Sequence, residues 1–235
     1  MTDRFSRFQY IGHQGGACPG VEPNTINAFI LGKKNGADII EIDIYMTKTG
    51  EFIVNRSPQI NGVNYWDINK KNCSDFENKQ LLHVLNWASK NQIRLMLDIK
   101  NWPAYDKSVS KNLISYVSDF ELEKNFLFIS YNHSIIHDIK KINSDLNAGI
   151  MYVGYLQNLL STVKVNNADF IETQTRFLTK QMISKLNQRN VKICSWCVND
   201  KKEIDELLQF DVDFIKTDCI KKTKQIVDEM ILGNK

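Results

Sequence analysis

The sequence predicts an α/β fold, namely a single (β/α)8 TIM barrel with a small extra hairpin and loop after its second strand. Eight short runs rich in β-branched and aromatic residues alternate with amphipathic helical stretches along almost all of the 235 residues. No Pro/Gly/Ser-rich linker or low-complexity segment interrupts the alternation, so we expect residues 1–235 to form one domain. An open, doubly wound sheet is the competing interpretation of the same pattern.

The elements follow in order from local patterns. Strands are expected at 8–13, 38–46, 93–100, 126–132, 148–154, 169–174, 191–199 and 213–218. Helices are expected within 25–36, 76–92, 108–120, 133–145, 179–190 and 201–210, where apolar residues recur at i, i+3 and i+4. After the second strand, TKTG (47–50) predicts a tight turn and EFIVNRSPQ (51–59) a short returning strand. The polar loop over 60–76 that follows is of a length that commonly covers an active site.

Composition and charge exclude several classes of protein. The chain is 43% hydrophobic and 24% charged, and no apolar run approaches the about 18 residues that a membrane helix needs. The net charge is +3 and Lys and Arg are scattered, which indicates neither a nucleic-acid partner nor a membrane-binding patch. The first residues hold no hydrophobic segment of a signal peptide, so a cytoplasmic location is expected. The oligomeric state stays open.

The five cysteines, an odd number, suggest free thiols in a reducing compartment. Cys194 and Cys197 have the spacing of a redox or metal-binding pair. Their segment is predicted to be a strand, on which positions i and i+3 face opposite sides. We therefore expect no joint function for these two cysteines.

The second predicted strand carries two carboxylates in a run of isoleucines, IIEIDIYM (39–46). Side chains on a strand alternate with period two, so Glu41 and Asp43 share one face with Tyr45. Two ionised carboxylates about 6 Å apart repel by roughly 3 kcal/mol at an effective dielectric constant near 20. The sequence therefore predicts a positive group between them.

Further polar side chains stand at the ends of other strands, where a barrel of this kind collects its reacting groups. His13 ends the first strand, and Asp98 and Lys100 share a face at the end of the third. Together with Glu41 and Asp43, Asp98 would form a three-carboxylate site suited to a hard cation such as Mg²⁺ or Ca²⁺. Lys100 would add an anion-binding charge and His13 a group that exchanges protons. The alternative is that Asp98 and Lys100 simply neutralise one another.

The order of motifs resembles the glycerophosphodiester phosphodiesterase family over essentially the whole chain. The motifs are IGHQGG (11–16), EPNT (22–25), GADIIEIDIYMTKTGEFIV (36–54), LMLDIK (95–100), SYN (130–132), CSWCVND (194–200) and VDFIKTD (212–218). The resemblance implies a (β/α)8 barrel, a divalent metal, and hydrolysis of small-molecule glycerophosphodiesters to glycerol 3-phosphate and an alcohol. It implies that His13 is catalytic, that Glu41 and Asp43 bind the metal, that Lys100 contacts the phosphate, and that Trp196 lines the glycerol side of the pocket.

The chain departs from the family pattern at four places. Gln14 replaces an arginine that contacts phosphate, and Glu22 precedes Pro23 where the family has Pro-Glu-Asn-Thr. Asp98 replaces the usual glutamate of the third metal ligand. Arg56 stands where the family carries a second catalytic histidine. Arginine keeps its proton at neutral pH, so Arg56 is expected to hold phosphate by its charge and not to transfer protons.

Two functions remain open at this stage. The first is a metal-dependent phosphodiesterase that favours substrates with a good leaving group, with His133 a possible source of the missing proton. The second is a barrel without turnover that binds a phosphorylated ligand. A Schiff-base lysine at position 100 is a third possibility, which the flanking carboxylates disfavour because they would hold Lys100 protonated.

Overall fold

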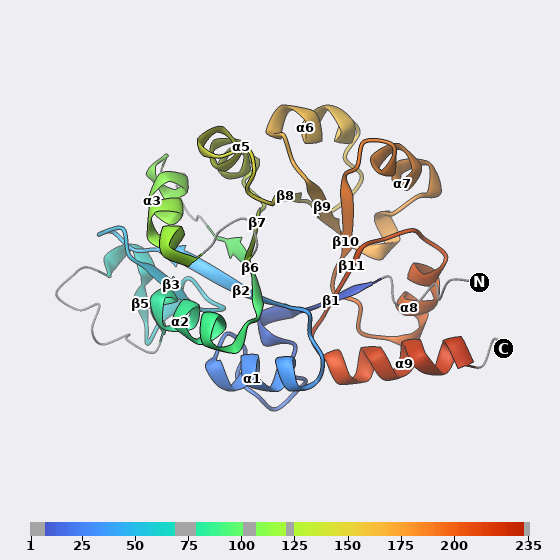
Figure 1. Ribbon diagram of the computed structural model, residues 1–235, viewed down its shortest axis with the longest axis horizontal. Helices are drawn as coiled ribbons and strands as arrows, with labels where there is room; N and C mark the ends of the chain where they lie inside the picture. The colour runs from blue at the N-terminus through green and yellow to red at the C-terminus, as the bar shows by residue number, and fades with distance from the viewer. Residues whose placement is uncertain (1–7, 69–78, 101–106, 121–124, 233–235) are drawn as a thin grey trace.

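Eight parallel strands close into a barrel, and in the described part of the chain a helix follows each of them on the outside (Figure 1). The computed structural model describes residues 8–68, 79–100, 107–120 and 125–232. The strands are β1 (Gln9–Gly12), β2 (Ile39–Met46), β6 (Arg94–Ile99), β7 (Phe126–Ser130), β8 (Ala148–Met151), β9 (Phe170–Thr173), β10 (Lys192–Ser195) and β11 (Phe214–Thr217). They pair in the order β1–β11–β10–β9–β8–β7–β6–β2, and β2 pairs with β1 to close the ring. The predicted (β/α)8 fold is confirmed.

The outer layer consists of helices that run around the barrel in chain order (Figure 1). They are α1 (Ile26–Lys34), α2 (Leu81–Asn91), α3 (Ser108–Val117), α5 (His133–Ile142), α6 (Leu159–Asn166), α7 (Lys180–Asn187), α8 (Lys201–Leu208) and α9 (Ile220–Leu232). Helices α6 and α9 were not among the predicted stretches. The strand predicted over 191–199 is shorter than expected and ends at Ser195. Beyond it the chain bends toward β11, where the Val198 amide donates to the Lys216 carbonyl over 2.9 Å.

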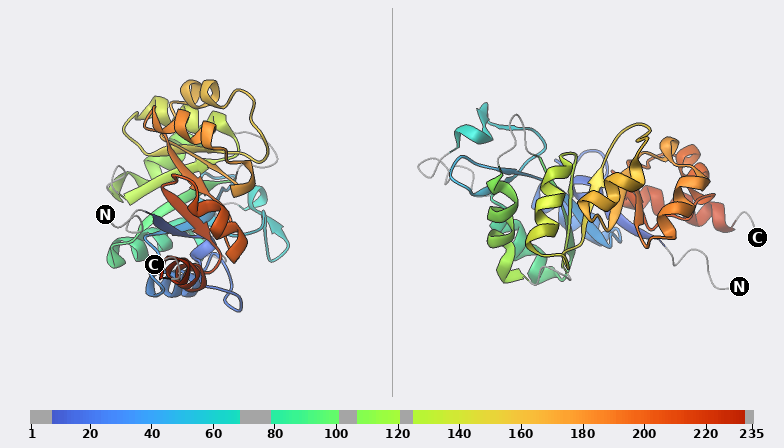
Figure 2. Two further views of the ribbon diagram at one scale, coloured as in Figure 1. Left: turned by 90° about the vertical axis from the view of Figure 1, so that its right-hand side faces the viewer. Right: turned by 90° about the horizontal axis from the view of Figure 1, so that it is seen from above.

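The predicted insertion after the second strand is present and holds two small hairpins. β3 (Phe52–Val54) pairs antiparallel with β2, and β4 (Gln59–Ile60) pairs with β5 (Val63–Asn64) before a 3₁₀ turn at Tyr65–Asp67. Buried apolar side chains tie this segment to the barrel, among them Tyr45, Ile53, Ile60, Tyr65 and Ile68. It projects at the end of the molecule opposite α8 and α9 (Figure 2). Residues 69–76 of the predicted loop lie outside the described residues.

The two faces of β2 carry different kinds of side chain, as the alternation along a strand predicts. Ile40, Ile42 and Ile44 pack in the cluster between the barrel and the helices, whereas Glu41 and Asp43 do not belong to it and are 0% and 1% exposed. A smaller apolar cluster, including Met96 and Phe214, fills the bottom of the barrel interior. The carboxylates therefore lie inside the barrel, away from the helix layer.

Helix α1 fixes the turn that follows β1. The Thr25 hydroxyl caps α1 by accepting from the Ala28 amide, a contact typical of helix starts. Gly32 lies so close to this turn that a Cβ atom would stand 1.8 Å from the Gly15 carbonyl oxygen. Only glycine permits α1 to lie this close to the 3₁₀ turn His13–Gly15 (η1). This contact holds η1 at the barrel mouth.

A disulfide joins Cys18 to Cys219, so the expectation of free thiols is wrong for these two residues. They stand 201 residues apart in sequence, but Cys18 follows η1 and Cys219 follows β11, and β1 and β11 are neighbours in the barrel. Their Cα atoms lie 4.1 Å apart. Cys194 and Cys197 are not bonded to one another, and Cys73 lies outside the described residues.

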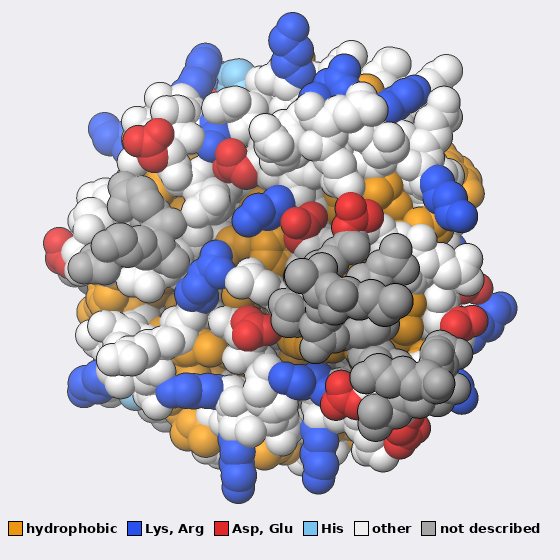
Figure 3. All heavy atoms as spheres, turned by 45° about the vertical axis from the view of Figure 1, so that its right-hand side comes forward, with side chains coloured by type: hydrophobic (Ala, Val, Ile, Leu, Met, Phe, Trp, Pro, Cys, Tyr) orange, Lys and Arg blue, Asp and Glu red, His pale blue; other side chains and the backbone are white. Residues whose placement is uncertain are grey.

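Charged side chains on the face drawn in Figure 3 are mixed in sign, with Lys and Arg interspersed among Asp, Glu and uncharged groups. Among the described residues we find no helix with both the length and the apolar character needed to cross a bilayer.

Candidate active site

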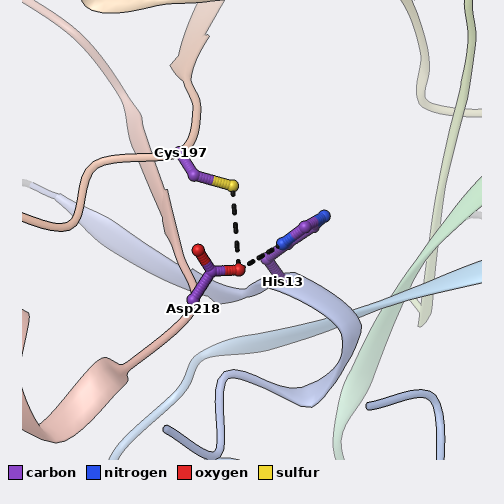
Figure 4. Close-up of side chains that lie close together, drawn as sticks. All are labelled: His13, Cys197 and Asp218. Carbon is purple, nitrogen blue, oxygen red and sulfur yellow. Dashed lines mark hydrogen bonds and ion pairs between the residues drawn. The ribbon is translucent and has the colours of Figure 1, made fainter. Parts of the chain in front are cut away.

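His13 and Asp218 meet at the mouth of the barrel, together with Cys197 (Figure 4). They follow β1, β11 and β10, which are adjacent strands. His13 Nδ1 lies 2.5 Å from Asp218 Oδ1, and the Cys197 Sγ lies 4.0 Å from the same oxygen. Asn199 holds the aspartate in place, since its Nδ2 donates to Asp218 Oδ2 over 2.5 Å and its Oδ1 accepts from the Asp218 amide over 2.9 Å.

The charges around this pair favour an imidazolium. Burial lowers the pKa of His13, but the charge of Glu41 and the hydrogen bond with Asp218 outweigh it and raise the pKa to about 11. The hydrogen bond from His13 lowers the pKa of Asp218 although burial opposes this, and the nearby guanidinium of Arg56 lowers it further. His13 is thus held by its Nδ1 atom, which leaves Nε2 as the ring nitrogen that can exchange a proton.

Glu41, Asp43 and Asp98 come together as the sequence predicted. Parallel pairing of β2 with β6 places Asp43 directly beside Asp98. One carboxylate oxygen from each residue lies within 4.8 Å of the others, and all three side chains are buried. The backbone amide of Gln14 donates to Glu41 Oε2 over 2.7 Å, and the Gln14 Nε2 donates to Asp43 Oδ2 over 2.6 Å. Asn24, from the EPNT motif, donates to the same Asp43 oxygen over 2.9 Å.

Glu41 and Asp43 each have their own lysine beside them, whereas the sequence predicted one positive group between the two. Lys100 Nζ lies 2.9 Å from Asp43 Oδ1 and also forms an ion pair with Asp98. Lys216 on β11 is 1% exposed, forms an ion pair with Glu172 and lies 3.8 Å from Glu41 Oε1. Burial lowers the pKa of Lys216, but Glu172 and Glu41 raise it well above its usual range. Both lysines are therefore charged.

The trio nevertheless remains short of positive charge. Among the described residues, Asp98 Oδ1 has no hydrogen-bond partner although it is buried, and Glu41 Oε1 and Asp43 Oδ1 are approached by Lys216 and Lys100 without a regular hydrogen bond. Burial raises the pKa of Asp98 to about 6, against the effect of Lys100. The four buried carboxylates, counting Glu172, carry two more charges than the two ammonium groups. With His13 left out of the count, one divalent cation would neutralise the interior. Hard oxygen donors with free lone pairs are the ligands that Mg²⁺ and Ca²⁺ prefer, so the residues fit such an ion.

Aromatic side chains line one side of the mouth. The Trp196 ring lies 6.4 Å from the His13 ring and 6.4 Å from the Tyr131 ring, and Lys216 Nζ lies 5.5 Å from its centroid. The Trp196 Nε1 is buried and has no hydrogen-bond partner among the described residues. A donor left free in this position is available to a bound molecule.

Three further candidate residues, Gln14, Arg56 and His133, each interact with a different part of the protein. Gln14 was expected to contact substrate, and in the structure its amide nitrogen is occupied by Asp43. The Arg56 side chain is exposed on the insertion and acts on Asp218 through its charge. The His133 Nε2 lies 2.9 Å from the Met151 carbonyl oxygen, which ties its ring to β8.

Comparisons with known proteins identify the family of the chain. The sequence model of the "Glycerophosphoryl diester phosphodiesterase family" matches residues 13–222. The chain belongs to this family. Members of the family hydrolyse phosphodiesters, so the chain is a member of a hydrolase family.

Relatives and solved structures share its length as well as its fold. A glycerophosphodiester phosphodiesterase of Caldanaerobacter subterraneus subsp. tengcongensis is 23% identical over 226 residues, which cover 88% of this chain and 93% of that protein. A putative glycerophosphoryl diester phosphodiesterase of Silicibacter pomeroyi superimposes with a TM-score of 0.83 at 16% identity, over 95% and 94% of the two chains. An Oleispira antarctica phosphodiesterase, solved with the product sn-glycerol-3-phosphate, gives 0.82 at 15% identity over 94% and 96%.

Sequence reasoning missed Lys216 and Cys197 as neighbours of the site. Lys216 stands inside the strand predicted over 213–218, where alternation puts it on the same face as Phe214 and Asp218. A lysine on that face, opposite the carboxylates, was the available signal. Cys197 gave no such signal, because its position depends on where β10 ends.

Proposed function

We propose that the chain is a metal-dependent phosphodiesterase that hydrolyses a glycerophosphodiester or a related phosphodiester. The observation that carries the proposal is the buried trio Glu41, Asp43 and Asp98, which brings three carboxylate oxygens within 4.8 Å of one another beside the His13–Asp218 pair. The bound product of the Oleispira antarctica enzyme and the names of the relatives support the substrate class. Family membership supports the reaction type.

In this proposal Glu41, Asp43 and Asp98 hold one Mg²⁺ or Ca²⁺ ion. The ion, when bound, supplies Lewis-acid stabilisation of the charge that builds up on the phosphoryl oxygens. Gln14 orients two of the three carboxylates through its backbone and side-chain amides, and Asn24 orients one of them. Such supporting hydrogen bonds fix ligand geometry and commonly change metal affinity when removed.

The chain's own groups then act on the substrate. Lys100 and Arg56 bind the phosphate by charge, and Trp196 forms the wall against the alcohol or glycerol part. Asp218 fixes His13 through Nδ1, so that His13 Nε2 moves the proton at the phosphate. An imidazolium whose pKa is raised to about 11 is a weak acid, so it gives the leaving oxygen little help.

We assign Arg56, from the resemblance of its motif, to the position of a second catalytic histidine in the family. Loss of one general acid or base typically costs roughly 10²- to 10⁴-fold in rate. We therefore propose that His13 is the one proton-transfer group and that substrates with good leaving groups are preferred. The alternative is a barrel that binds a phosphorylated ligand without turnover, and the same substitution at Arg56 favours it.

Hydrolysis assays separate these functions. Glycerophosphocholine and bis(p-nitrophenyl) phosphate are compared with and without Mg²⁺ or Ca²⁺, for the wild type, His13→Ala and Asp98→Asn, with His133→Ala as the matched histidine control. We expect metal-dependent turnover, faster for the activated ester, that His13→Ala and Asp98→Asn abolish and His133→Ala retains. No turnover of either ester, with thermal stabilisation by glycerol 3-phosphate, would favour the binding barrel. Loss of turnover in His133→Ala would instead make that histidine the missing acid.

We further propose one domain over residues 1–235 and a small-molecule diester as the ligand. A cytoplasmic location stays a prediction. The Cys18–Cys219 disulfide argues against it, because disulfides are commoner in oxidising compartments. Alkylation of free thiols in fresh cell extract, before and after reduction, measures whether this pair is bonded in the cell.

A further inference from the structure

A second group of metal-binding side chains stands at the mouth of the barrel, separate in its chemistry from the carboxylate trio. His13 Nδ1, Cys197 Sγ and one Asp218 carboxylate oxygen all lie within 4.8 Å of one another (Figure 4). We propose that these three residues form a site for Zn²⁺ or a similar soft transition metal, and that its occupation inhibits the enzyme. The inhibitory part rests on the proposed function, whereas the metal site does not.

The donor atoms are close to the positions that zinc requires. Tetrahedral zinc with Zn–S near 2.3 Å and Zn–N and Zn–O near 2.1 Å places its ligand atoms about 3.3 to 3.6 Å apart. The observed separations are 2.5 Å from His13 Nδ1 to Asp218 Oδ1 and 4.0 Å from Cys197 Sγ to that oxygen. The first pair must open and the second must close, each by less than about 1 Å.

The donor set selects a different metal from the one expected at the trio. Imidazole and thiolate favour zinc and other soft or borderline ions, whereas three carboxylates favour Mg²⁺ or Ca²⁺. The two sites can therefore be loaded with different ions in one protein. Cys197 decides this difference, because without its sulfur only one imidazole and one carboxylate remain.

The surroundings leave the site both supported and accessible. Asn199 engages Asp218 Oδ2 and the Asp218 amide, which leaves Oδ1 directed at the other two ligands. The Asp218 side chain is 51% exposed and that of His13 is 20% exposed, so an ion can enter and water can complete its coordination. Second-shell hydrogen bonds of this kind are a usual feature of zinc ligands.

Binding would exchange protons for the metal. The Cys197 thiol and His13 Nδ1 each release a proton to solvent, the hydrogen bond between His13 and Asp218 breaks, and the thiolate, the ring nitrogen and the carboxylate bind the ion. His13 would lose the aspartate that orients it and gain a cation on Nδ1. The ring is then no longer an imidazolium, and the N–H that remains on its other nitrogen is a weaker acid than an imidazolium, which is why we expect inhibition.

Cobalt spectroscopy on the full, Mg²⁺-saturated protein tests the site without any substrate. A thiolate–cobalt bond gives a charge-transfer band in the near ultraviolet, and tetrahedral Co²⁺ gives an intense visible band. We expect both bands at one equivalent of Co²⁺, reversed by one equivalent of Zn²⁺. Cys197→Ala should lose the charge-transfer band and bind Zn²⁺ about tenfold or more weakly, whereas the matched change Cys194→Ala, at a buried thiol inside the barrel, should retain both. Wild-type spectra without the thiolate band, or unchanged Zn²⁺ affinity in Cys197→Ala, would overturn the site.

Hydrolysis of bis(p-nitrophenyl) phosphate then tests inhibition, as the ratio of rates with and without Zn²⁺ within each variant. The ratio should fall in the wild type and in Cys194→Ala at Zn²⁺ concentrations that leave it near one in Cys197→Ala. Equal inhibition of all three proteins would place the inhibitory zinc at the carboxylate trio and overturn the regulatory role. If the zinc-free wild type shows no turnover, the proposed function fails and the inhibitory role fails with it, while the cobalt spectra still decide the metal site.

Discussion

Lys216 is the residue whose replacement should leave the most uncompensated negative charge inside the barrel. Its ammonium group is buried with the carboxylates of Glu172 and Glu41, which are both 0% exposed. Lys216→Met keeps the length of the side chain and removes the charge. The carboxylate of Glu172 is then left inside the barrel without its ion-pair partner.

Three estimates agree on the size of the effect. At 3.8 Å the attraction between Lys216 and Glu41 alone is about 4 kcal/mol for an effective dielectric constant of 20. Breaking a buried ion pair by removing one partner costs about 3–5 kcal/mol. Protonating a glutamate taken from water at pH 7 costs about 4 kcal/mol, which caps the penalty because the stranded carboxylate can bind a proton instead. We therefore expect Lys216→Met to lose about 4 kcal/mol at pH 7.

The same reasoning fixes the pH dependence. Below the ordinary pKa of glutamate the unfolded chain is already protonated, so the stranded carboxylate costs little there. The loss of unfolding free energy in Lys216→Met should grow by up to about 1.4 kcal/mol per pH unit above the ordinary glutamate pKa. It should be about 1 kcal/mol at pH 5. In the wild type the raised pKa of Lys216 contributes stability that is fully present below the lysine pKa of about 10.4 and is lost only as the pH rises through the higher folded-state value.

Urea unfolding at pH 5 and pH 7 measures both effects. The matched control is Lys140→Met, because Lys140 is also buried but pairs with Asp169, whose side chain is 40% exposed and can be hydrated. Lys140→Met should lose less free energy of unfolding than Lys216→Met, and its loss should change little with pH. Adding Glu172→Met to Lys216→Met should recover at least half of the lost free energy. A deficit below about 1 kcal/mol at pH 7, or one that is equal at both pH values, would refute the reasoning.

Three other outcomes are expected. Replacing Cys18 and Cys219 by serine should lower the free energy of unfolding by up to about 5 kcal/mol, the chain-entropy value for a loop of this length, and reduction of the wild type should match it in a thermal melt. Asp218→Asn should lower the NMR-measured pKa of His13 in the metal-free protein by about 1–2 units, since one charged hydrogen bond is removed. The stability that the raised His13 pKa contributes is fully present below about pH 6.5 and is lost as the pH rises toward 11, so the two proteins should differ most at low pH. Gln14→Ala should weaken Mg²⁺ binding about 10- to 100-fold by calorimetry, and unchanged affinity would show that the side-chain hydrogen bond from Gln14 does not position Asp43.

The parts of the fold that local patterns determine could be predicted from the sequence. Alternation in β2 separated Glu41 and Asp43 from the isoleucines, because burial on a strand has period two. The convergence of His13, Asp98 and Lys100 followed from one further rule, that parallel barrel strands bring their carboxyl ends to one face.

What escaped prediction depends on contacts between distant elements. The Cys18–Cys219 disulfide forms because barrel closure makes β1 and β11 neighbours, and cysteine counting carries no information on that register. Cys197 reaches His13 only because β10 ends at Ser195 and the chain then bends toward β11. Element boundaries of this kind depend on tertiary contacts and have no local sequence signal.

The fixed charges give one electrostatic account of the unusual residues in this site. The interior carries four carboxylates, and Lys100 and Lys216 neutralise part of that charge from two different strands. Arg56 adds a further permanent cation at the rim, where its field lowers the pKa of Asp218 and thereby supports the His13–Asp218 pair. In the proposed assignment of Arg56 to the position of the family's second histidine, a titratable group is replaced by a charge that does not titrate. In the proposed function, phosphate binding would then be insensitive to pH near neutrality, and the leaving group's own acidity would set which diesters the enzyme can cleave.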